Sequence, residues 1–322
     1  MKKFVLVIGA LALVCLAGLA WFASGWYGSA DVEEDTTFIV PQGATLTAIA
    51  GKLEEEGLVG SADGFLLRAK ILGSGDPVQA GEFLVPAGAS AANILDTFQS
   101  GQVIRRFVTV PEGLPSILVW EKLMAEDLLT GDIPVPEEGS ILPDTYDFER
   151  GEPRAQVVAR MQAAMDAYLA EAWTNRTAQT VVKSPEEALV LASIVEKETA
   201  GADERPMVAG ALSNRIRIGM MLGADATTIY PITKGKPLGR RIRVSELRDT
   251  NPYNTRAVAG LPPGPITNPG RESIAAVLDP AQTKALYYVA DGSGGHVFAE
   301  TLEEHNRNAA AWRKLRRERG EM

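Results

Sequence analysis

Two glutamates, Glu196 and Glu198, carry the clearest potential for acid–base chemistry in this sequence. They end the segment 184–200, in which residues 188–195 are apolar except for one serine. Carboxylates stabilise the N-terminal end of a helix and not its C-terminal end, where the macrodipole is negative. The pair is therefore badly placed for stability. Either the helix has surfaced and the glutamates are solvated, or one of them stays in an apolar pocket as a general acid.

The helix that must position these glutamates has a clear start. Ser184 is a favourable N-cap, Pro185 suits the first helical position, and Glu187 completes a capping box. Residues two apart lie about 200° apart around a helix, so Glu196 and Glu198 cannot both face one pocket. Glu198 continues the more apolar row of the helix, which favours it as the buried residue. The pair alone cannot form the two-carboxylate dyad of a glycosidase.

The N-terminal segment predicts a membrane anchor. Residues Phe4 to Ala23 are twenty consecutive uncharged, mostly apolar positions. At about 1.5 Å per residue they span about 30 Å, the thickness of a bilayer core. Lys2 and Lys3 precede them, so the N-terminus should stay cytoplasmic while the remainder crosses. A cleaved signal peptide is the competing interpretation. The run is longer than a typical signal-peptide core, so we expect an uncleaved anchor.

Composition and charge exclude several classes of function. The chain has 322 residues, 46% apolar and 23% charged, which is globular and sufficient for two modest domains. Its formal charge is −9, and without the two lysines near the N-terminus the exported part carries −9 − 2 = −11. An acidic exported protein is a poor candidate for binding nucleic acid. Cys15 is the only cysteine, so no internal disulfide can form, and with two histidines His/Cys zinc spacing is absent. We expect no metal and no other cofactor.

A short internal repeat follows the anchor. Residues 38–43 (FIVPQG) recur as 83–88 (FLVPAG) and, more loosely, as 108–113 (VTVPEG). Each copy predicts a short strand and a Pro-Gly turn, and the first two continue into a capped amphipathic helix. Such small α+β units resemble the LysM-like modules of cell-wall proteins. A plain packing module without a ligand is the alternative.

The region after the glutamate helix is rich in turns. Residues 222–230 lead into a basic, hairpin-like stretch over 232–243. Four prolines stiffen residues 260–270, which could form either a sugar-binding wall or a structural cover over the core. A β-hairpin is expected around the glycine-rich residues 291–295, with His296 at its edge in a structural role rather than a catalytic one. The arginine-rich end of the chain suits the solvated face of a last helix.

Motifs in the second half of the chain resemble one family. In order they read LASIVEKETA, ER-x(5)-AL-SNRI-x-IGM, D-x-T-x-IY, NPYNT, GLPPGPITNPG and YYVADGSGGHVF. Together they resemble the YceG-like endolytic murein transglycosylases, single-pass inner-membrane enzymes that cleave peptidoglycan glycan strands. The resemblance extends over essentially the whole chain. Two positions depart from the family's pattern: Ala226 replaces the proline of Asp-Pro-Thr, and Met221 stands where a proline or basic residue is common.

The resemblance implies an α+β fold in three parts. These are a cytoplasmic N-terminus and transmembrane helix over residues 1–28, a LysM-like module over 36–105, and a mixed α+β catalytic domain over 106–322. It implies a location in the inner membrane with the catalytic domain on the periplasmic, outer side. Glycan strands would be the substrate, and peptidoglycan synthases are candidate partners.

The resemblance also implies a chemistry that needs one carboxyl group, that of Glu198. Protonated Glu198 would donate to the oxygen between N-acetylmuramic acid and N-acetylglucosamine. The carboxylate would then take the proton of the muramyl C6 hydroxyl as that oxygen attacks C1, leaving a 1,6-anhydro end. Such an acid works best with a pKa of about 6 instead of about 4.3, and a rise of about 2 units is worth about 2.7 kcal/mol. Motif position implies that seven polar residues hold the sugars: Asp225, Thr227, Tyr230, Tyr253, Asn254, Thr255 and Asn268.

Two other functions stay open at this point. One is a hydrolase on the same substrate, with Glu198 and a distant carboxylate such as Asp225, which would give reducing ends instead of anhydro ends. The other is a membrane-tethered wall-binding or scaffold protein whose working part is the repeat module. Loss of all cleavage without loss of wall binding in a Glu198→Gln variant would separate an enzyme from this alternative.

Overall fold

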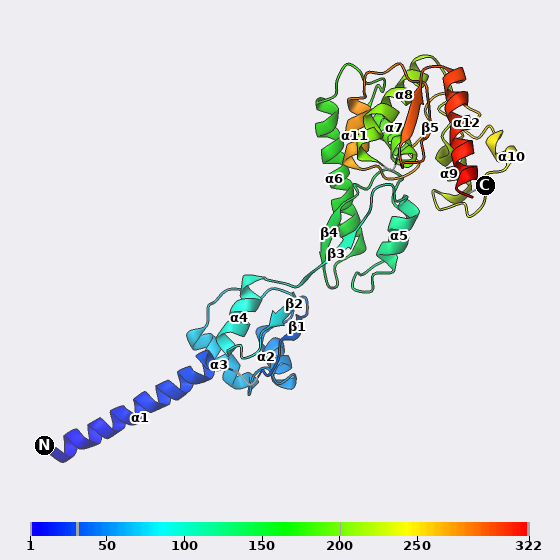
Figure 1. Ribbon diagram of the computed structural model, residues 1–322. Coiled ribbons are helices and arrows are strands. Elements are labelled where there is room, and N and C mark those ends of the chain that lie inside the picture. Colours follow the sequence, from blue (N-terminus) through cyan, green and yellow to red (C-terminus); the bar gives the residue numbers. More distant parts are fainter. Residues whose placement is uncertain (1, 30–31, 200, 321–322) are drawn as a thin grey trace. The chain divides into compact units, whose positions relative to one another are not determined.

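The computed structural model describes residues 2–29, 32–199 and 201–320 (Figure 1). Met1, where the anchor is expected to begin, and Ala200, the last residue of the LASIVEKETA motif, lie outside the described residues. The described residues form helices and short strands, so the predicted mixed α+β fold is confirmed.

The chain divides into two compact units. One comprises residues 1–106 with 148–150, and the other comprises residues 107–147 with 151–322. The division falls within two short paired strands, β3 (Arg105–Thr109) and β4 (Thr145–Glu149).

The first unit contains the N-terminal helix and the first two copies of the repeat. Its elements are α1 (Lys2–Tyr27), β1 (Thr36–Val40), α2 (Leu46–Glu55), α3 (Ala62–Leu72), β2 (Gly81–Val85) and α4 (Ala91–Ser100). In both copies the strand enters a turn whose glycine, Gly43 or Gly88, has a φ of 73° or 70°. The helix that follows is capped by a hydroxyl, that of Thr45 or Ser90. The predicted strand, turn and capped helix are confirmed for both copies.

Aromatic side chains form the centre of this unit. Strands β1 and β2 pair antiparallel with Phe38 opposite Phe83. The ring of Phe98 lies 5.2 Å from that of Phe38 and 5.0 Å from that of Phe83. Trp26, near the end of α1, is only 2% exposed and its ring lies 5.7 Å from that of Phe65. The end of α1 is therefore part of the core of this unit.

The greater part of α1 has the properties of a membrane span. Residues Lys3–Tyr27 form one helix, whose most apolar 18-residue window has a mean hydropathy of 2.6. No residue of that window is buried. A helical signal sequence would share this length and composition. The helix is therefore a candidate membrane anchor.

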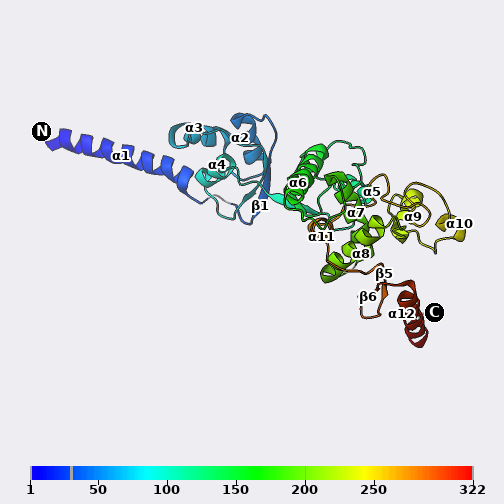
Figure 2. The same cartoon turned by 90° about the horizontal axis from the view of Figure 1, so that it is seen from above.

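The second unit is built around α7 (Pro185–Glu198). This helix packs against four others, and α7, α8 and α11 lie together in Figure 2. The other elements of the unit are α5 (Ser116–Met124), α6 (Arg154–Thr174), the 3-10 helix η1 (Ala202–Glu204), α8 (Arg205–Arg217), α9 (Asp225–Thr233), α10 (Val244–Leu247), α11 (Arg271–Leu278), β5 (Tyr287–Ala290), β6 (His296–Ala299) and α12 (Leu302–Glu318).

Two expectations for the turn-rich region had different outcomes. The hairpin around the glycine-rich turn is confirmed, because β5 and β6 pair antiparallel with Tyr288 opposite Phe298. The hairpin-like interpretation of residues 232–243 is wrong, since this fully described stretch contains no strand and begins inside α9. Pro231 lies within α9, and at the start of this helix the Thr227 hydroxyl donates to the Ala224 carbonyl and lies 2.8 Å from the Thr255 hydroxyl.

Candidate active site

The helix that ends at the two glutamates begins where the sequence predicts. The Ser184 hydroxyl accepts a hydrogen bond from the Glu187 N–H at 3.2 Å. The Glu187 carboxylate in turn accepts from the N–H of Lys183 at 2.7 Å, one residue earlier than in a standard capping box. The apolar stretch of the helix lies in the core of the second unit. Its burial fixes the direction in which the last turn presents its side chains.

Glu198 occupies a half-buried position with a defined hydrogen-bond donor. Its Oε2 accepts from the Tyr288 hydroxyl at 3.0 Å. Burial raises the pKa of Glu198, and the negative charge of Asp225 raises it further. The hydrogen bond from Tyr288 and the charges of Arg256 and Arg215 act in the opposite direction, but the pKa remains above its ordinary value. Glu198 thus keeps its proton to a higher pH than a solvated glutamate.

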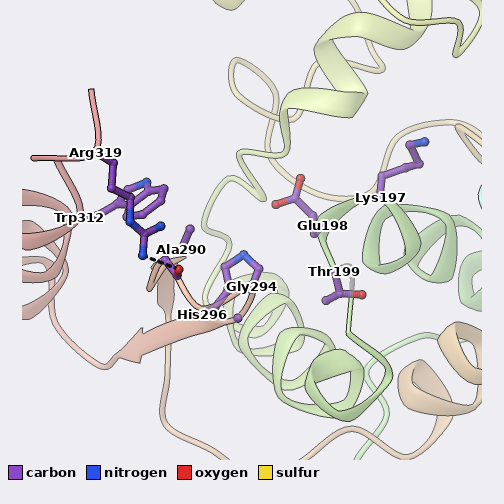
Figure 3. A pocket seen from close by; sticks show the side chains of 10 residues that line it. Lys197, Glu198, Thr199, Ala290, Gly294, His296, Trp312 and Arg319 are labelled. Carbon is purple, nitrogen blue, oxygen red and sulfur yellow. Dashed lines mark hydrogen bonds between the residues drawn. The ribbon is translucent and has the colours of Figure 1, made fainter. Parts of the chain in front are cut away.

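A cavity of about 440 Å³ opens beside Glu198 (Figure 3). In Figure 3 Glu198 lies across this space from Trp312 and Arg319, which belong to the region of α12. The lining comprises Lys197, Glu198, Thr199, Ala290, Gly292, Gly294, Gly295, His296, Trp312 and Arg319. A cavity that contains a carboxyl group of raised pKa is suited to acid–base catalysis.

His296 lines the same cavity and is held firmly by one carboxylate. Glu204 accepts from the backbone N–H of His296 and bonds its ring Nδ1, each at 2.7 Å. Because a carboxylate accepts, Nδ1 carries the proton and Nε2 is the ring nitrogen left to meet a ligand. The ring also lies edge-on to that of Tyr288, with centroids 5.6 Å apart. His296 thus has the structural contacts expected from the sequence and also a place in the cavity wall.

Glu196 is held in the interior by hydrogen bonds and an ion pair and does not face solvent. Its side chain is only 6% exposed. Its Oε2 accepts from the Gly270 N–H at 2.9 Å and from the Ser273 hydroxyl at 2.7 Å, and its Oε1 lies 3.5 Å from Arg205. Gly270 is the N-cap residue of α11, so the carboxylate satisfies the start of that helix. The two glutamates therefore have separate environments.

Three of the seven candidate substrate residues are buried and form hydrogen bonds within the protein interior. Thr227, Asn254 and Thr255 are at most 1% exposed. The hydroxyls of Thr227 and Thr255 lie 2.8 Å apart, and Asn254 accepts from the Thr228 hydroxyl at 2.7 Å. These bonds attach the start of α9 to the NPYNT loop, and none of the three residues is among those that line the cavity.

Asn268 is buried in another place. Its side-chain oxygen accepts from the Ile141 N–H at 3.1 Å, and its amide donates to the Leu114 carbonyl at 2.8 Å and the Ser116 hydroxyl at 3.1 Å. The backbone of the same loop donates from Ile266 to the Ser193 hydroxyl in α7. These contacts join the proline-rich loop to the core, as expected of a structural cover. Asn268 is not among the residues that line the cavity.

The remaining three candidates differ in exposure, from the exposed Asp225 to Tyr230, which is only 8% exposed. Asp225 is paired with Arg256 at 2.5 Å, and both side chains are well exposed. Tyr230 and Tyr253 have ring centroids 4.9 Å apart. Beside Tyr230 lies Glu138, whose pKa is raised by burial although it accepts a hydrogen bond from the start of α5. The structure thus links Asp225 to Glu198 electrostatically and gathers the tyrosines around a different carboxylate.

Sequence motifs assigned no role to several residues in or beside the cavity. Tyr288 and Glu204 lie within recognised motifs, where nothing distinguished them from their neighbours. Trp312 and Arg319 lie in a segment whose composition indicated only a solvated helix. Their positions depend on long-range packing. Among the residues that the structure describes, no cluster of three or more His, Cys, Asp or Glu is arranged to hold a metal ion.

Comparisons with known proteins point to one family. A model of the YceG-like family matches residues 38–311. The endolytic murein transglycosylase of Bacillus subtilis (strain 168) is 27% identical over 309 residues, which cover 86% of this chain and 84% of that protein. The Streptococcus pneumoniae (serotype 2, strain D39) protein of the same name is 28% identical over an alignment of 358 positions, which covers 92% of this chain and 64% of that protein.

A solved structure agrees with these sequence matches. The crystal structure of a YceG-like protein from Listeria monocytogenes aligns with a TM-score of 0.54 at 25% identity. The alignment covers 85% of this chain and 98% of that one. With a family match over most of its length and a related fold, the chain belongs to the YceG-like family.

Proposed function

We propose that this chain is an endolytic murein transglycosylase with Glu198 as its single catalytic acid and base. It cleaves the β-1,4 bond between N-acetylmuramic acid and N-acetylglucosamine within glycan strands, trimming or ending nascent strands. The observation that carries the proposal is the position of Glu198. Its carboxyl group borders the cavity, accepts from Tyr288 and has a raised pKa. The family and the names of its relatives support the reaction class.

In each catalytic cycle Glu198 first donates one proton and then accepts another. Neutral Glu198 protonates the glycosidic oxygen while the bond from muramyl C1 to that oxygen breaks. The muramyl C6 oxygen bonds to C1, and its proton passes to the Glu198 carboxylate, which restores the acid. No water is consumed, so the site needs no second carboxylate at dyad distance. Tyr288 orients the carboxyl group between its two roles.

The motif residues position this chemistry rather than perform it. We propose that Asp225 and Tyr253 contact the sugars directly, because they are the more exposed of the motif residues, and that Tyr230, only 8% exposed, contributes to the sugar site through its ring contact with Tyr253. Thr227, Asn254, Thr255 and Asn268 support the sugar-binding surface through their interior hydrogen bonds.

The remainder of the chain places the site at the membrane. We propose that α1 is an uncleaved anchor within residues 1–28 in the cytoplasmic membrane, with the cavity on the outer side. Residues 36–105 form a LysM-like module that contacts glycan strands, and residues 106–322 form the catalytic domain. Peptidoglycan synthases that make nascent strands are the proposed partners.

The identity of the new chain ends tests the reaction. Purified protein is incubated with isolated glycan strands, and the products are analysed by mass spectrometry. The proposal predicts 1,6-anhydromuramyl ends, which are lighter by one water than reducing ends. Reducing ends would instead favour a hydrolase in which Asp225, the carboxylate that acts on Glu198 electrostatically, activates water. Intact strands that nevertheless bind the protein would favour a scaffold role.

A further inference from the structure

The wall of the cavity opposite Glu198 comes from the end of the chain. Trp312 and Arg319 line it together with the glycine-rich turn between β5 and β6. Helix α12 packs against both strands of this hairpin. The family match ends at residue 311, so both side chains lie beyond the part of the chain that the family model covers.

The packing of the turn fixes Trp312 in the cavity wall. Gly292 has a φ of +86°, and a Cβ at this position would lie 2.4 Å from Leu315 and 2.9 Å from the Trp312 ring. Only glycine allows this close approach of the turn to α12. The turn also contributes Gly294 and Gly295 to the lining, so Trp312 is the one large aromatic surface among the residues that line the cavity.

Arg319 brings a positive charge with unused donors. One nitrogen donates to the Gly292 carbonyl at 3.0 Å, which anchors the guanidinium at the cavity. A guanidinium has five N–H donors, and no other acceptor for Arg319 is found among the described residues. Lys197 borders the cavity too, but its ammonium donates to the Gly113 carbonyl at 3.3 Å and points away from Arg319 in Figure 3. The positive charge that faces Glu198 across the cavity is therefore that of Arg319. Such local charge favours an anionic ligand.

We propose that Trp312 and Arg319 form a subsite for a peptide-bearing muramyl unit of the glycan strand. The flat ring of Trp312 packs against the C–H face of a pyranose, whose weakly positive hydrogens suit the negative face of an aromatic ring. Arg319 binds a carboxylate of the peptide stem, for which its planar donor pair is suited. This proposal rests on the proposed function for its substrate and adds a specificity for strands that retain their peptides.

The test compares two substrates and a matched pair of arginine variants. The substrates are glycan strands with intact peptide stems and the same strands after the stems have been removed by an amidase. The variants are Arg319→Gln and, as the control on the same helix, Arg313→Gln, which does not line the cavity. Trp312→Ala and the conservative Trp312→Phe test the aromatic surface. Melting temperatures show whether each variant is folded.

We expect Arg319→Gln to raise KM for peptide-bearing strands about tenfold, the effect of losing a charge-assisted hydrogen bond, with kcat nearly constant. KM for stripped strands should not change, and Arg313→Gln should match the wild type on both substrates. Trp312→Ala should raise KM on both substrates, and Trp312→Phe should restore most of the loss. Equal effects of Arg319→Gln on both substrates, or no effect, would overturn the proposal.

Binding measurements separate this proposal from the proposed function. Calorimetry measures the affinity of the Glu198→Gln protein for short strands of the same two kinds. Because this variant should not cleave the strands, the affinities report binding at the subsite alone. Tighter binding of peptide-bearing strands, lost on adding Arg319→Gln, supports the subsite even if wild-type products turn out to carry reducing ends. Equal affinity for both strands would refute it even if the products are anhydro ends.

Discussion

Glu196→Gln should destabilise the second unit strongly while leaving the chemistry intact. The Glu196 carboxylate accepts from the Gly270 N–H and the Ser273 hydroxyl and lies near Arg205, with its side chain 6% exposed. A glutamine with its oxygen at the Oε2 position keeps both acceptor bonds but only as neutral ones, and its amide group then faces Arg205, so the ion pair is lost. Hydrogen bonds to charged groups are worth about 1.5–3 kcal/mol and neutral ones about 0.5–1.5 kcal/mol, so weakening two bonds and losing the ion pair gives a loss of about 2–4 kcal/mol in the free energy of unfolding.

The loss of stability is limited by the ion pairs that Arg205 keeps. Arg205 still pairs with Glu112 at 2.9 Å and with Glu272, so its charge is not left unpaired. In a unit of about 200 residues, 1 kcal/mol shifts the melting temperature by roughly 2–4 °C, so we expect a decrease of roughly 5–15 °C.

Calorimetric melting and activity at low temperature together check this prediction. Glu186→Gln is the matched control, because Glu186 lies on the same helix at an exposed position, and its melting temperature should remain close to that of the wild type. At 20 °C the folded Glu196→Gln variant should retain most of its anhydromuropeptide release. An unchanged melting temperature would show that the carboxylate does not cap α11, and a stable but inactive variant would move the catalytic role to Glu196.

Three further outcomes follow from the structure. Intact-mass analysis of membrane-extracted protein should show a chain that begins at or near Met1, whereas a start near Trp21 would establish cleavage. Trp26→Ala should cost the first unit about 3–5 kcal/mol, measured by its thermal unfolding, and a negligible loss would show that α1 ends outside its core. Tyr288→Phe removes a donor that lowers the pKa of Glu198, so the alkaline limb of the pH–rate profile should move to higher pH, and a shift to lower pH would contradict the assignment of that limb to Glu198.

Local sequence patterns predicted the elements that are fixed by neighbouring residues. The start of α7 at Ser184 and the turns at Gly43 and Gly88 follow from capping and backbone preferences that act within a few residues. The helical angle between Glu196 and Glu198 was likewise predictable, because it depends only on the helix itself.

Features that depend on distant contacts could not be predicted in this way. Glu196 meets its partner Gly270 across 74 residues, and Tyr288 meets Glu198 across 90. Nothing within either segment indicates the other. The same holds for Trp312, which reaches the cavity only because α12 packs on the hairpin. The proposed catalytic role of Glu198 and the sugar-binding roles remain predictions that need experiment.

The raised pKa of Glu198 also determines how stability changes with pH. Between the pKa of the unfolded chain and the higher pKa of the folded protein, the folded state binds more protons, so stability falls as pH rises through this range. Glutamine has no such titration. Glu198→Gln should therefore melt no lower than the wild type at neutral pH, which excludes unfolding as a cause of lost activity.

The central claim, that Glu198 transfers the proton, is tested most directly by anhydromuropeptide release from isolated glycan strands by folded Glu198→Gln protein. Glutamine keeps the size and hydrogen-bonding capacity of the side chain but cannot exchange a proton. Release should fall at least about 100-fold relative to the wild type, the lower range for loss of a general acid–base group. Release within a few-fold of the wild type by a folded Glu198→Gln protein would contradict the account.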